Sequence, residues 1–248
     1  MRIDILTLFP EMCEAVLGGS IIGRAVKSGI VEVHCHNIRD YTDSRHRRVD
    51  DYPYGGGPGM LMSAEPIAAA FEAVCGEAGE RPLFIYMSPQ GEVFSQEKAV
   101  SLSKEQNICL LCGHYEGVDE RVIEEMVDME ISCGDYVLTG GELPALIVTD
   151  AVCRMIPGVL SAADCYEQES HMSGLLEYPQ YTRPAVWRGR AVPDVLLSGH
   201  EANILRWRRE RSLEKTLSRR SDMLFCAKLT KNDRNFLVTK GWEKDTSE

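Results

Sequence analysis

The sequence predicts an α/β protein with a mostly parallel sheet, followed by a small all-helical domain that is rich in basic residues. Three observations lead to this prediction. Short apolar runs alternate with helical patterns over residues 3–156, a polar and aperiodic stretch follows residue 160, and the net charge changes sign between the two parts of the 248-residue chain.

The strands of the expected sheet are short runs of mostly apolar residues, which is typical of strands buried on both faces. These runs are Ile3–Phe9, Val31–Asn37, Leu83–Met87 and Asn107–Cys112. Strands of this kind, separated by helices, favour a parallel sheet.

The helices of this part are predicted where apolar residues recur at spacings of three and four, with Gly29 and Gly76 among the residues near helix ends. They are Glu11–Leu17, Ser20–Ser28, Glu65–Val74, Gln96–Leu102 and Val118–Met126. A longer apolar helix is expected over Leu143–Ile156, because Pro157-Gly158 would end it there.

A domain boundary is expected after this long helix. The stretch Ser161–Gly174 is polar and aperiodic, which indicates a linker. Beyond it, Glu201–Leu217 and roughly Lys231–Lys240 have helical patterns. We therefore expect an α/β domain over residues 1–160, a flexible linker over 161–175 and a basic helical domain over 176–248.

The charge distribution points to a polyanionic partner. The whole chain carries 27 Lys and Arg against 38 Asp and Glu, a net charge of -11. Residues 177–248, however, hold 15 basic against 10 acidic residues. Within them, residues 183–220 hold 10 basic against 4 acidic residues and also contain Trp187 and Trp207. This pattern is typical of a nucleic-acid site, and a solvated helix face is the alternative interpretation of a basic run alone.

Composition excludes several classes of protein. With 44% apolar and 26% charged residues, the chain is globular, and disordered, collagen-like and mini-protein classes are excluded. No apolar run approaches the roughly 18–20 residues of a membrane span, and the first four residues lack the layout of a signal peptide. Nine cysteines scattered through apolar segments favour a reducing compartment, so we expect a cytoplasmic protein with no membrane partner.

Familiar nucleotide and metal motifs are absent from the sequence. No G-x-G-x-x-G follows a strand and no Gly-Lys-Ser/Thr follows a glycine-rich loop, which argues against dinucleotide-binding and P-loop proteins. Cys109 and Cys112 form a C-x-x-C pair, but residues three apart on a strand point to opposite faces. His34 and His36 share a strand face without thiolate or carboxylate partners nearby in sequence, so no metal site is expected.

Three glycine-rich segments follow apolar, strand-like runs: Ser88–Gly91, Gly113–Gly117 and Gly134–Gly141. Ligands of open α/β sheets bind at the carboxyl ends of strands, where glycine lets the backbone approach a ligand closely. The segments offer backbone groups, a carboxylate and aromatic rings but no cluster of Lys or Arg. They therefore predict one pocket that suits a nucleoside better than a polyphosphate.

Long motifs of the chain resemble the bacterial tRNA (guanine-N1)-methyltransferases that modify position 37, a family of the knotted SPOUT class. The matching segments are Arg2–Pro10, Val49–Met60, Leu111–Arg121, Ile131–Ala145, Gly174–Pro184 and Ser198–Arg208. The resemblance implies a trefoil knot at the C-terminal end of the α/β domain, a helical tRNA-binding domain and a homodimer. It also implies S-adenosylmethionine as the methyl donor, G37 of tRNA as the acceptor and a possible role for Mg²⁺ in catalysis.

The same resemblance implies which residues bind the donor, and they fall in or beside the three glycine-rich segments. They are Tyr86, Pro89, Gly91, Gly113, Glu116, Ser132, Cys133, Gly134, Asp135, Tyr136, Val137, Leu138, Gly140, Gly141 and Pro144.

Methylation of guanine N1 requires a base that removes the N1 proton and a cation that stabilises the charge developing on O6. By resemblance, Arg154 is the cation. The base position departs from the family, which usually reads Asp-Ser-Phe where this chain reads Glu169-Ser170-His171. Glu169 is the expected base, with Asp164 and Glu167 as nearby substitutes.

The expected RNA-binding residues are Gly59 in the loop Gly55–Gly59, which would position the target nucleotide, and Arg183, His200, Trp207 and Arg208. For Trp207, a place in a helix core is an equally good interpretation.

Two other functions remain open. The chain could methylate another RNA or another atom, such as a ribose hydroxyl. Methylation of a hydroxyl would require an arrangement of catalytic groups different from the Arg154–Glu169 pairing. It could also be an RNA-binding module that has lost catalysis, for which the substituted base is the best support.

Overall fold

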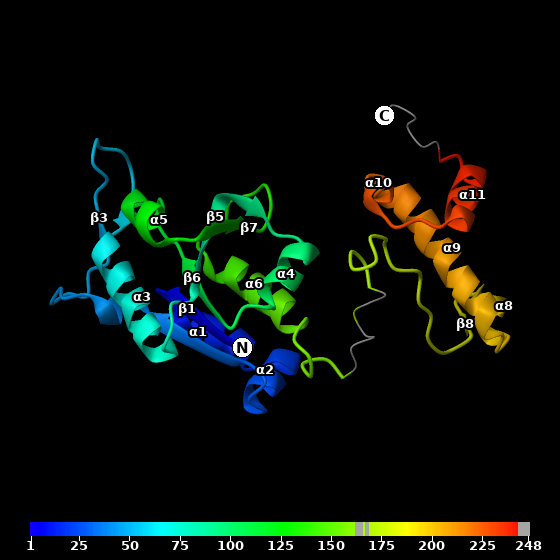
Figure 1. Cartoon of the computed structure of the whole chain (residues 1–248), viewed down its shortest axis with the longest axis horizontal. Helices are drawn as coiled ribbons and strands as arrows, with labels where there is room; N and C mark the ends of the chain where they lie inside the picture. Colours follow the sequence, from blue (N-terminus) through cyan, green and yellow to red (C-terminus); the bar gives the residue numbers. More distant parts are fainter. Residues whose placement is uncertain (162–165, 167–168, 243–248) are drawn as a thin grey trace. The chain divides into compact units, whose positions relative to one another are not determined.

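The computed structural model describes residues 1–161, 166 and 169–242. The chain divides into two compact units, Met1–Ala162 and Ala163–Glu248. Figure 1 shows a sheet with helices in the first unit and mainly helices in the second.

The first unit is built on a five-stranded sheet in which every described pair of neighbours is parallel. The order across the sheet is β2 (Glu32–Asn37), β1 (Arg2–Thr7), β6 (Asn107–Cys112), β5 (Leu83–Val93) and β7 (Met129–Ser132). The mostly parallel α/β sheet is thus confirmed. The edge strand β7 is absent from the four runs predicted as strands, because Glu130 and Ser132 alternate with its apolar residues and no apolar run marks it.

The helices of this unit agree with the predicted ones to within a few residues. They are α1 (Pro10–Leu17), α2 (Ser20–Lys27), α3 (Ala64–Ala78), α4 (Gln96–Leu102), α5 (Glu120–Met126) and α6 (Glu142–Cys153), with a 3₁₀ turn η1 (Ile38–Tyr41) and a short pair β3 (Asp50–Asp51) and β4 (Leu61–Met62).

Two predicted helix boundaries are wrong, for local reasons. Helix α5 begins at Glu120 and not at Val118, because the Asp119 side chain caps it by accepting a hydrogen bond from the Arg121 amide. Helix α6 ends at Cys153 and not at Ile156. The following residues form 3₁₀-type hydrogen bonds between residues three apart, such as Ile156 N to Cys153 O.

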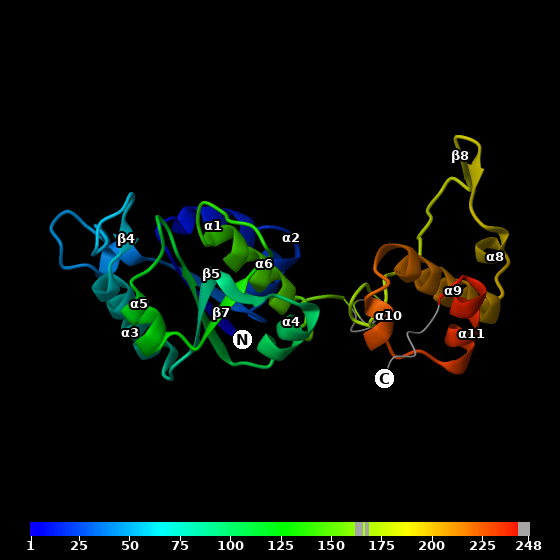
Figure 2. The same cartoon turned by 90° about the horizontal axis from the view of Figure 1, so that it is seen from above.

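Alternating strand residues build a separate core on each face of the sheet. Ile5, Ile85 and Leu110 pack on one face with α1, α2, α4 and α6. Leu6 and Phe84 pack on the other with α3, α5 and η1. Figure 2 shows α1 and α6 together on one side of the sheet and α3 and α5 on the other. Both faces are covered, which explains why β1, β6 and the first half of β5 are apolar runs.

The C-x-x-C pair is divided between these two cores. Cys109 belongs to one core and Cys112 to the other, both fully buried, so the prediction that their side chains point to opposite faces of the strand is confirmed. Burial raises the pKa of both thiols. The eight described cysteines are free thiols.

One buried polar cluster joins β1 to β2. Asp4 is fully buried and accepts two hydrogen bonds of 2.8 Å from the Arg2 guanidinium and one of 2.8 Å from His36. Asp4, His36 and Glu77 have ligand atoms close enough to hold a metal ion, but Arg2 donates to both Asp4 and Glu77. His36 therefore has a carboxylate partner that its sequence neighbourhood does not reveal.

The second unit contains α8 (Asp194–Leu197), α9 (Glu201–Arg219), α10 (Met223–Cys226) and α11 (Lys231–Thr239), and a hairpin of β8 (Val186–Trp187) and β9 (Arg190–Ala191). Its small core consists of Leu175, Leu213, Leu224, Leu237 and Trp242. Asp233 in the first turn of α11 accepts hydrogen bonds from the Arg209 guanidinium and so ties α11 to α9. The β8–β9 hairpin corrects the prediction of an all-helical domain.

Candidate functional site: a glycine-lined cavity at the ends of three strands

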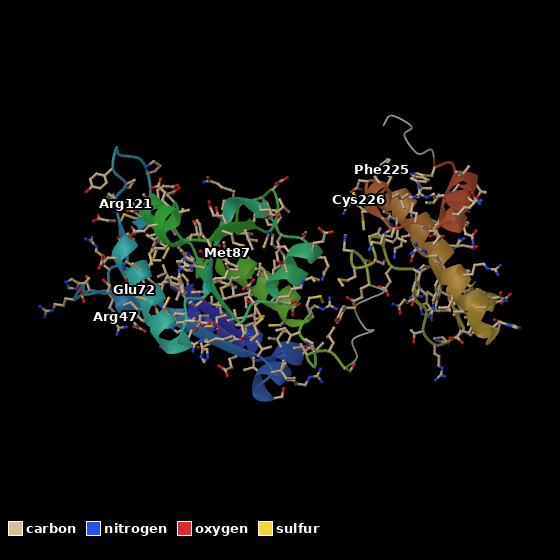
Figure 3. The ribbon with its side chains drawn as sticks, viewed as in Figure 1. Arg47, Glu72, Met87, Arg121, Phe225 and Cys226 are labelled. Carbon is tan, nitrogen blue, oxygen red and sulfur yellow. The ribbon has the colours of Figure 1, made fainter. Side chains whose placement is uncertain are left out.

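The first unit contains a cavity of about 480 Å³ at the carboxyl ends of β5, β6 and β7. Its walls come from residues 86–90, 113–118, 130–133, 136–141 and 144, together with Leu61, Glu120 and Ile123. Met87, labelled in the interior of the first unit in Figure 3, lies on β5 and lines it. The three glycine-rich segments therefore meet at one cavity, within the roughly 300–1,000 Å³ range of small-molecule sites.

Strand β5 reaches the cavity through an irregularity that the sequence does not predict. Its pairing with β7 shifts register between Met87 and Glu92, so the residues between them bulge out of the sheet. Gly91 closes this bulge against β7, because a Cβ atom there would lie 2.4–2.5 Å from the backbone of Glu130.

The loop after β7 lies tightly against the loop after β6. The Gly141 amide donates a 2.9 Å hydrogen bond to the Gly113 carbonyl. A Cβ on Gly141 would lie 2.6 Å from Cys112 Cα, and one on Gly113 would lie 2.8 Å from the Tyr86 hydroxyl. Glycine is therefore required at these positions by the close approach of neighbouring atoms.

Twelve of the fifteen residues expected to bind the donor line this cavity: Tyr86, Pro89, Gly113, Glu116, Ser132, Cys133, Tyr136, Val137, Leu138, Gly140, Gly141 and Pro144. Gly91, Gly134 and Asp135 do not line it. Gly134 adopts a φ of +145° and the Tyr136 ring lies over it, so it shapes the loop. That these residues bind a donor remains a prediction.

The lining of the cavity is acidic. Glu116, Glu120 and Glu130 line it, and no Lys or Arg is among the described residues that do. Burial, and then the charges of Glu130 and Glu120, raise the pKa of Tyr86 to about 12. The Tyr86 phenol therefore keeps its proton at neutral pH and can donate a hydrogen bond.

Behind the cavity lies a buried polar network that sequence reasoning missed. Glu142, in the first turn of α6, is 2% exposed and accepts a 2.5 Å hydrogen bond from the Thr7 hydroxyl. Both of its carboxylate oxygens lie 2.7–2.8 Å from Nε2 of His114, which lines the cavity. The only sequence signal is a glutamate between a glycine pair and an apolar helix, where the helix dipole favours negative charge.

The loop Gly55–Gly59 reaches this cavity at one end. Gly59 has a φ of +84° and lies so close to Glu116 that a Cβ atom would be 2.4 Å from Glu116 Cγ. The Glu116 amide also donates a 3.0 Å hydrogen bond to Met60 O. Gly55, Gly56 and Gly57 also have positive φ and would have open space around a Cβ atom.

The two expected catalytic residues belong to different units. Arg154 is half-buried and lies immediately after α6 in the first unit. Glu169 is half-buried in the second unit, where its amide donates to Tyr166 O. The substitutes Asp164 and Glu167 lie outside the described residues. The Arg154–Glu169 pairing therefore stays a prediction.

A second cavity, of about 570 Å³, lies wholly within the second unit. Three of the expected RNA-binding residues, Arg183, Trp207 and Arg208, line it. His200, which precedes α9 as its N-cap, is exposed and does not line it. Trp207 is half-buried and outside the core of this unit, so its interpretation as a core residue is wrong.

Comparison with known proteins gives a consistent result over the whole chain. Residues 1–225 match the family described as tRNA (Guanine-1)-methyltransferase TrmD. A tRNA (guanine-N(1)-)-methyltransferase of Ruminiclostridium cellulolyticum is 57% identical over 223 residues, which cover 90% of this chain and 96% of that protein. Those of Alkaliphilus oremlandii and Caldanaerobacter subterraneus are each 56% identical, covering 96% and 98% of this chain and 97% and 100% of their own.

Proposed function

The chain belongs to the tRNA (guanine-1)-methyltransferase family, and on this basis we propose that the cavity of its first unit binds the methyl donor. The chain is a tRNA methyltransferase, and its family methylates N1 of guanosine 37. The family implies S-adenosylmethionine as the methyl donor. The single observation that carries the location is the meeting of three glycine-rich loops at the carboxyl ends of adjacent parallel strands.

The residues of the cavity fit this donor. Backbone groups of the glycine loops can hydrogen-bond an adenine, and the apolar residues Leu138 and Ile131 supply a slot for its ring. The carboxylates of Glu116 and Glu130 suit a cation better than they suit a phosphate. When bound, S-adenosylmethionine would supply an electrophilic methyl group on a positively charged sulfur.

Two side chains act on the acceptor guanine, one as the base and the other as the cation that stabilises the charge on O6. Glu169 accepts the N1 proton of guanine, which leaves negative charge spread toward O6. Arg154 donates hydrogen bonds to O6 and stabilises that charge. A glutamate extends one methylene further than the family's aspartate, so its backbone must stand correspondingly further from N1.

We infer that Arg154 serves the cavity of a second copy of the chain. Helix α6 begins beside the cavity at Glu142 and ends at Cys153. Twelve residues at 1.5 Å each place Arg154 about 18 Å along the helix from the glycine loop of its own chain. A side chain does not bridge that distance, so a homodimer with a shared site is the arrangement that uses Arg154.

An apolar surface next to the cavity supports this homodimer. Phe9, Met12 and Val16 from the region of α1, and Leu143 and Ile147 from α6, are 40–58% exposed. Each helix presents a pair at a spacing of four, and α1 packs beside α6. The Phe9 ring lies 5.0 Å from that of His114, which lines the cavity. We propose that this surface, the α1–α6 face, contacts the same face of a second copy.

The chain is also proposed to be knotted at α6. After β7 at the sheet edge, residues 133–141 pass across the ends of β5 and β6, where Gly141 bonds to Gly113. Helix α6 then packs against β6, β1 and α4. This return of the chain from the sheet edge to β6 and β1 supports the proposal of the trefoil knot that the family resemblance implies.

The second unit is proposed to bind the tRNA, through basic and aromatic residues that include Arg183, Trp207 and Arg208. Its charge balance over residues 183–220 suits a phosphate backbone. No helix of the described residues is long and apolar enough to cross a membrane. Action on tRNA in the cytoplasm and a requirement for Mg²⁺ are further parts of the proposal.

Single-turnover methyl transfer tests the proposed function. The full chain is mixed with radiolabelled S-adenosylmethionine and a tRNA transcript that carries G37, and a matched transcript differs only at that base. We expect label on N1 of G37 and none on the control. Equal labelling of both transcripts would indicate another acceptor, and no labelling of either would indicate an RNA-binding module without catalysis.

A further inference from the structure

We propose that the 570 Å³ cavity of the second unit binds one unstacked nucleobase of the tRNA, separate from the guanosine that is methylated. The inference deepens the proposed function, because it rests on the second unit binding tRNA. The sequence predicts only that single residues contact RNA. The proposal adds that the cavity binds a nucleobase and names the side chains on which the base stacks.

The cavity, here called the aromatic cavity, is formed by three parts of the second unit. One wall is the extended segment Tyr178–Ala185, and the others come from α8 and α9. Its lining combines apolar and aromatic residues with two arginines, a glutamine and a threonine, and contains no Asp or Glu among the described residues: Tyr178, Pro179, Gln180, Tyr181, Thr182, Arg183, Ala185, Val192, Leu196, Leu197, Ile204, Trp207 and Arg208.

Two aromatic rings in the aromatic cavity are arranged to accept a planar ligand. Tyr181 and Trp207 have ring centroids 6.3 Å apart and planes tilted by 52°, so the two rings do not stack on each other. Tyr181 is 49% exposed and Trp207 is half-buried. Aromatic side chains at solvent-accessible positions are the usual partners of bases that have left their stack.

Arg208 supplies an unused polar contact. Its guanidinium carbon lies 4.9 Å from the centroid of the Tyr178 ring, which holds the side chain at the wall of the cavity. Its Nε atom is buried and has no hydrogen-bond partner among the described residues. A buried donor without an acceptor is costly, and a base edge or a phosphate oxygen would satisfy it.

The charge around the aromatic cavity favours a nucleotide over an apolar peptide. Residues 183–220, which include most of the lining, hold 10 basic and 4 acidic residues. The volume of about 570 Å³ lies in the range of sites for single small ligands. Stacking rings, arginine donors and positive charge together match a nucleobase with its attached phosphate.

Filter binding of tRNA to the full chain, without methyl donor, tests the proposal. Trp207→Leu keeps an apolar side chain but removes the aromatic face, and we expect the Kd to rise roughly 5- to 150-fold, as for loss of one stacked base. Trp207→Phe should stay within about threefold of the wild type, because it keeps a stacking face. Phe225→Leu is the matched control, since Phe225 is 60% exposed on α10 and lies outside both the aromatic cavity and the basic residues 183–220.

Transcripts with single abasic nucleotides identify the base. At one position, removal of the base should raise the Kd of the wild-type protein by a factor similar to that of Trp207→Leu. The same abasic transcript should not raise the Kd of the Trp207→Leu protein any further, which is the coupling expected of a direct contact. Circular dichroism checks the fold, and Tyr181→Leu, at a more exposed position, repeats the test if Trp207→Leu is unfolded.

The outcomes separate this proposal from the proposed function. Wild-type binding with no dependence on Trp207 or Tyr181, equal weakening by Phe225→Leu, or the absence of any coupled abasic position would overturn the base-binding cavity and leave the methyltransferase function intact. Failure of the wild type to bind tRNA at all would overturn both.

Discussion

Gly141→Ala tests whether the glycine contacts between the loops shape the donor site. Gly141 has a φ of -83°, which alanine adopts without strain, so the effect comes from space alone. The new Cβ would lie 2.6 Å from Cys112 Cα and 2.9 Å from Gly113 N. Ordinary contact begins at 3.4 Å, so the loops must separate by about 0.8 Å. Both neighbours are backbone atoms, and no side-chain rotation relieves the contact.

This displacement sets the expected magnitude. Overpacking of this kind costs about 1–3 kcal/mol, and a unit of this size loses roughly 2–4 °C in Tm for each kcal/mol. We therefore expect the Tm to fall by about 2–12 °C. Because the shift moves Gly113 and Tyr86 in the cavity wall, the affinity for S-adenosylmethionine should fall by about one to two orders of magnitude.

Calorimetry measures both quantities, and Gly76→Ala is the control. Gly76 is exposed within α3, and a Cβ atom there would meet no atom within 4 Å. That variant should bind the donor as the wild type does and gain roughly 0.5–1 kcal/mol in stability. A Gly141→Ala protein with wild-type Tm and wild-type donor affinity would refute the assignment of the donor to these loops.

Four further outcomes are expected. Glu169→Gln should slow single-turnover methyl transfer by about 10² to 10⁴ at unchanged donor affinity, and higher pH should restore part of the rate; a wild-type rate at neutral pH would contradict the base assignment. Arg208→Gln should reduce the slope of log Kd against log salt by roughly 0.7, whereas an unchanged slope would make Arg208 a packing residue. If the proposed homodimer forms through the α1–α6 face, Ile147→Glu should convert it to monomer in sedimentation equilibrium, and a retained dimer would exclude this face as the interface. Burial alone would raise the pKa of Asp4, but hydrogen bonds from Arg2 and His36 outweigh it and lower that pKa. Charged Asp4 therefore stabilises the fold above its ordinary pKa, and this contribution is lost as the pH falls through the lowered value. Asp4→Asn should lower the free energy of unfolding, measured in urea at pH 7, by roughly 3–5 kcal/mol. The difference between the two proteins must become smaller in strong acid, where Asp4 is protonated.

Local sequence pattern predicts most elements of the first unit and the position of its site. The runs that became β1 and β6 are apolar because both faces of the sheet are covered, so their sequences alone identify buried strands. The glycine-rich segments identify the cavity because strand ends of a parallel sheet lie at one edge. Similarly, the charge reversal along the chain is visible without any structure.

Contacts between distant segments were decided only by the tertiary structure. Thr7, His114 and Glu142 come from three segments up to 135 residues apart, and nothing near any one of them indicates the others. Asp4 and His36 likewise meet because β1 and β2 pair. Strand pairing order is set by the packing of whole elements, so a buried hydrogen-bond network across strands leaves almost no local trace.

The sequence by itself determined the α/β class, the two-part charge distribution and, through its long motifs, the methyltransferase family. The tertiary structure decided the bulge of β5 against β7, the buried network behind the glycine-lined cavity, the distance of Arg154 from its own cavity, and the aromatic cavity of the second unit. The physical reason is one of range. Periodicity and composition reflect whether each residue is exposed to solvent or buried in a core. A cavity depends instead on which surfaces the folded chain brings together.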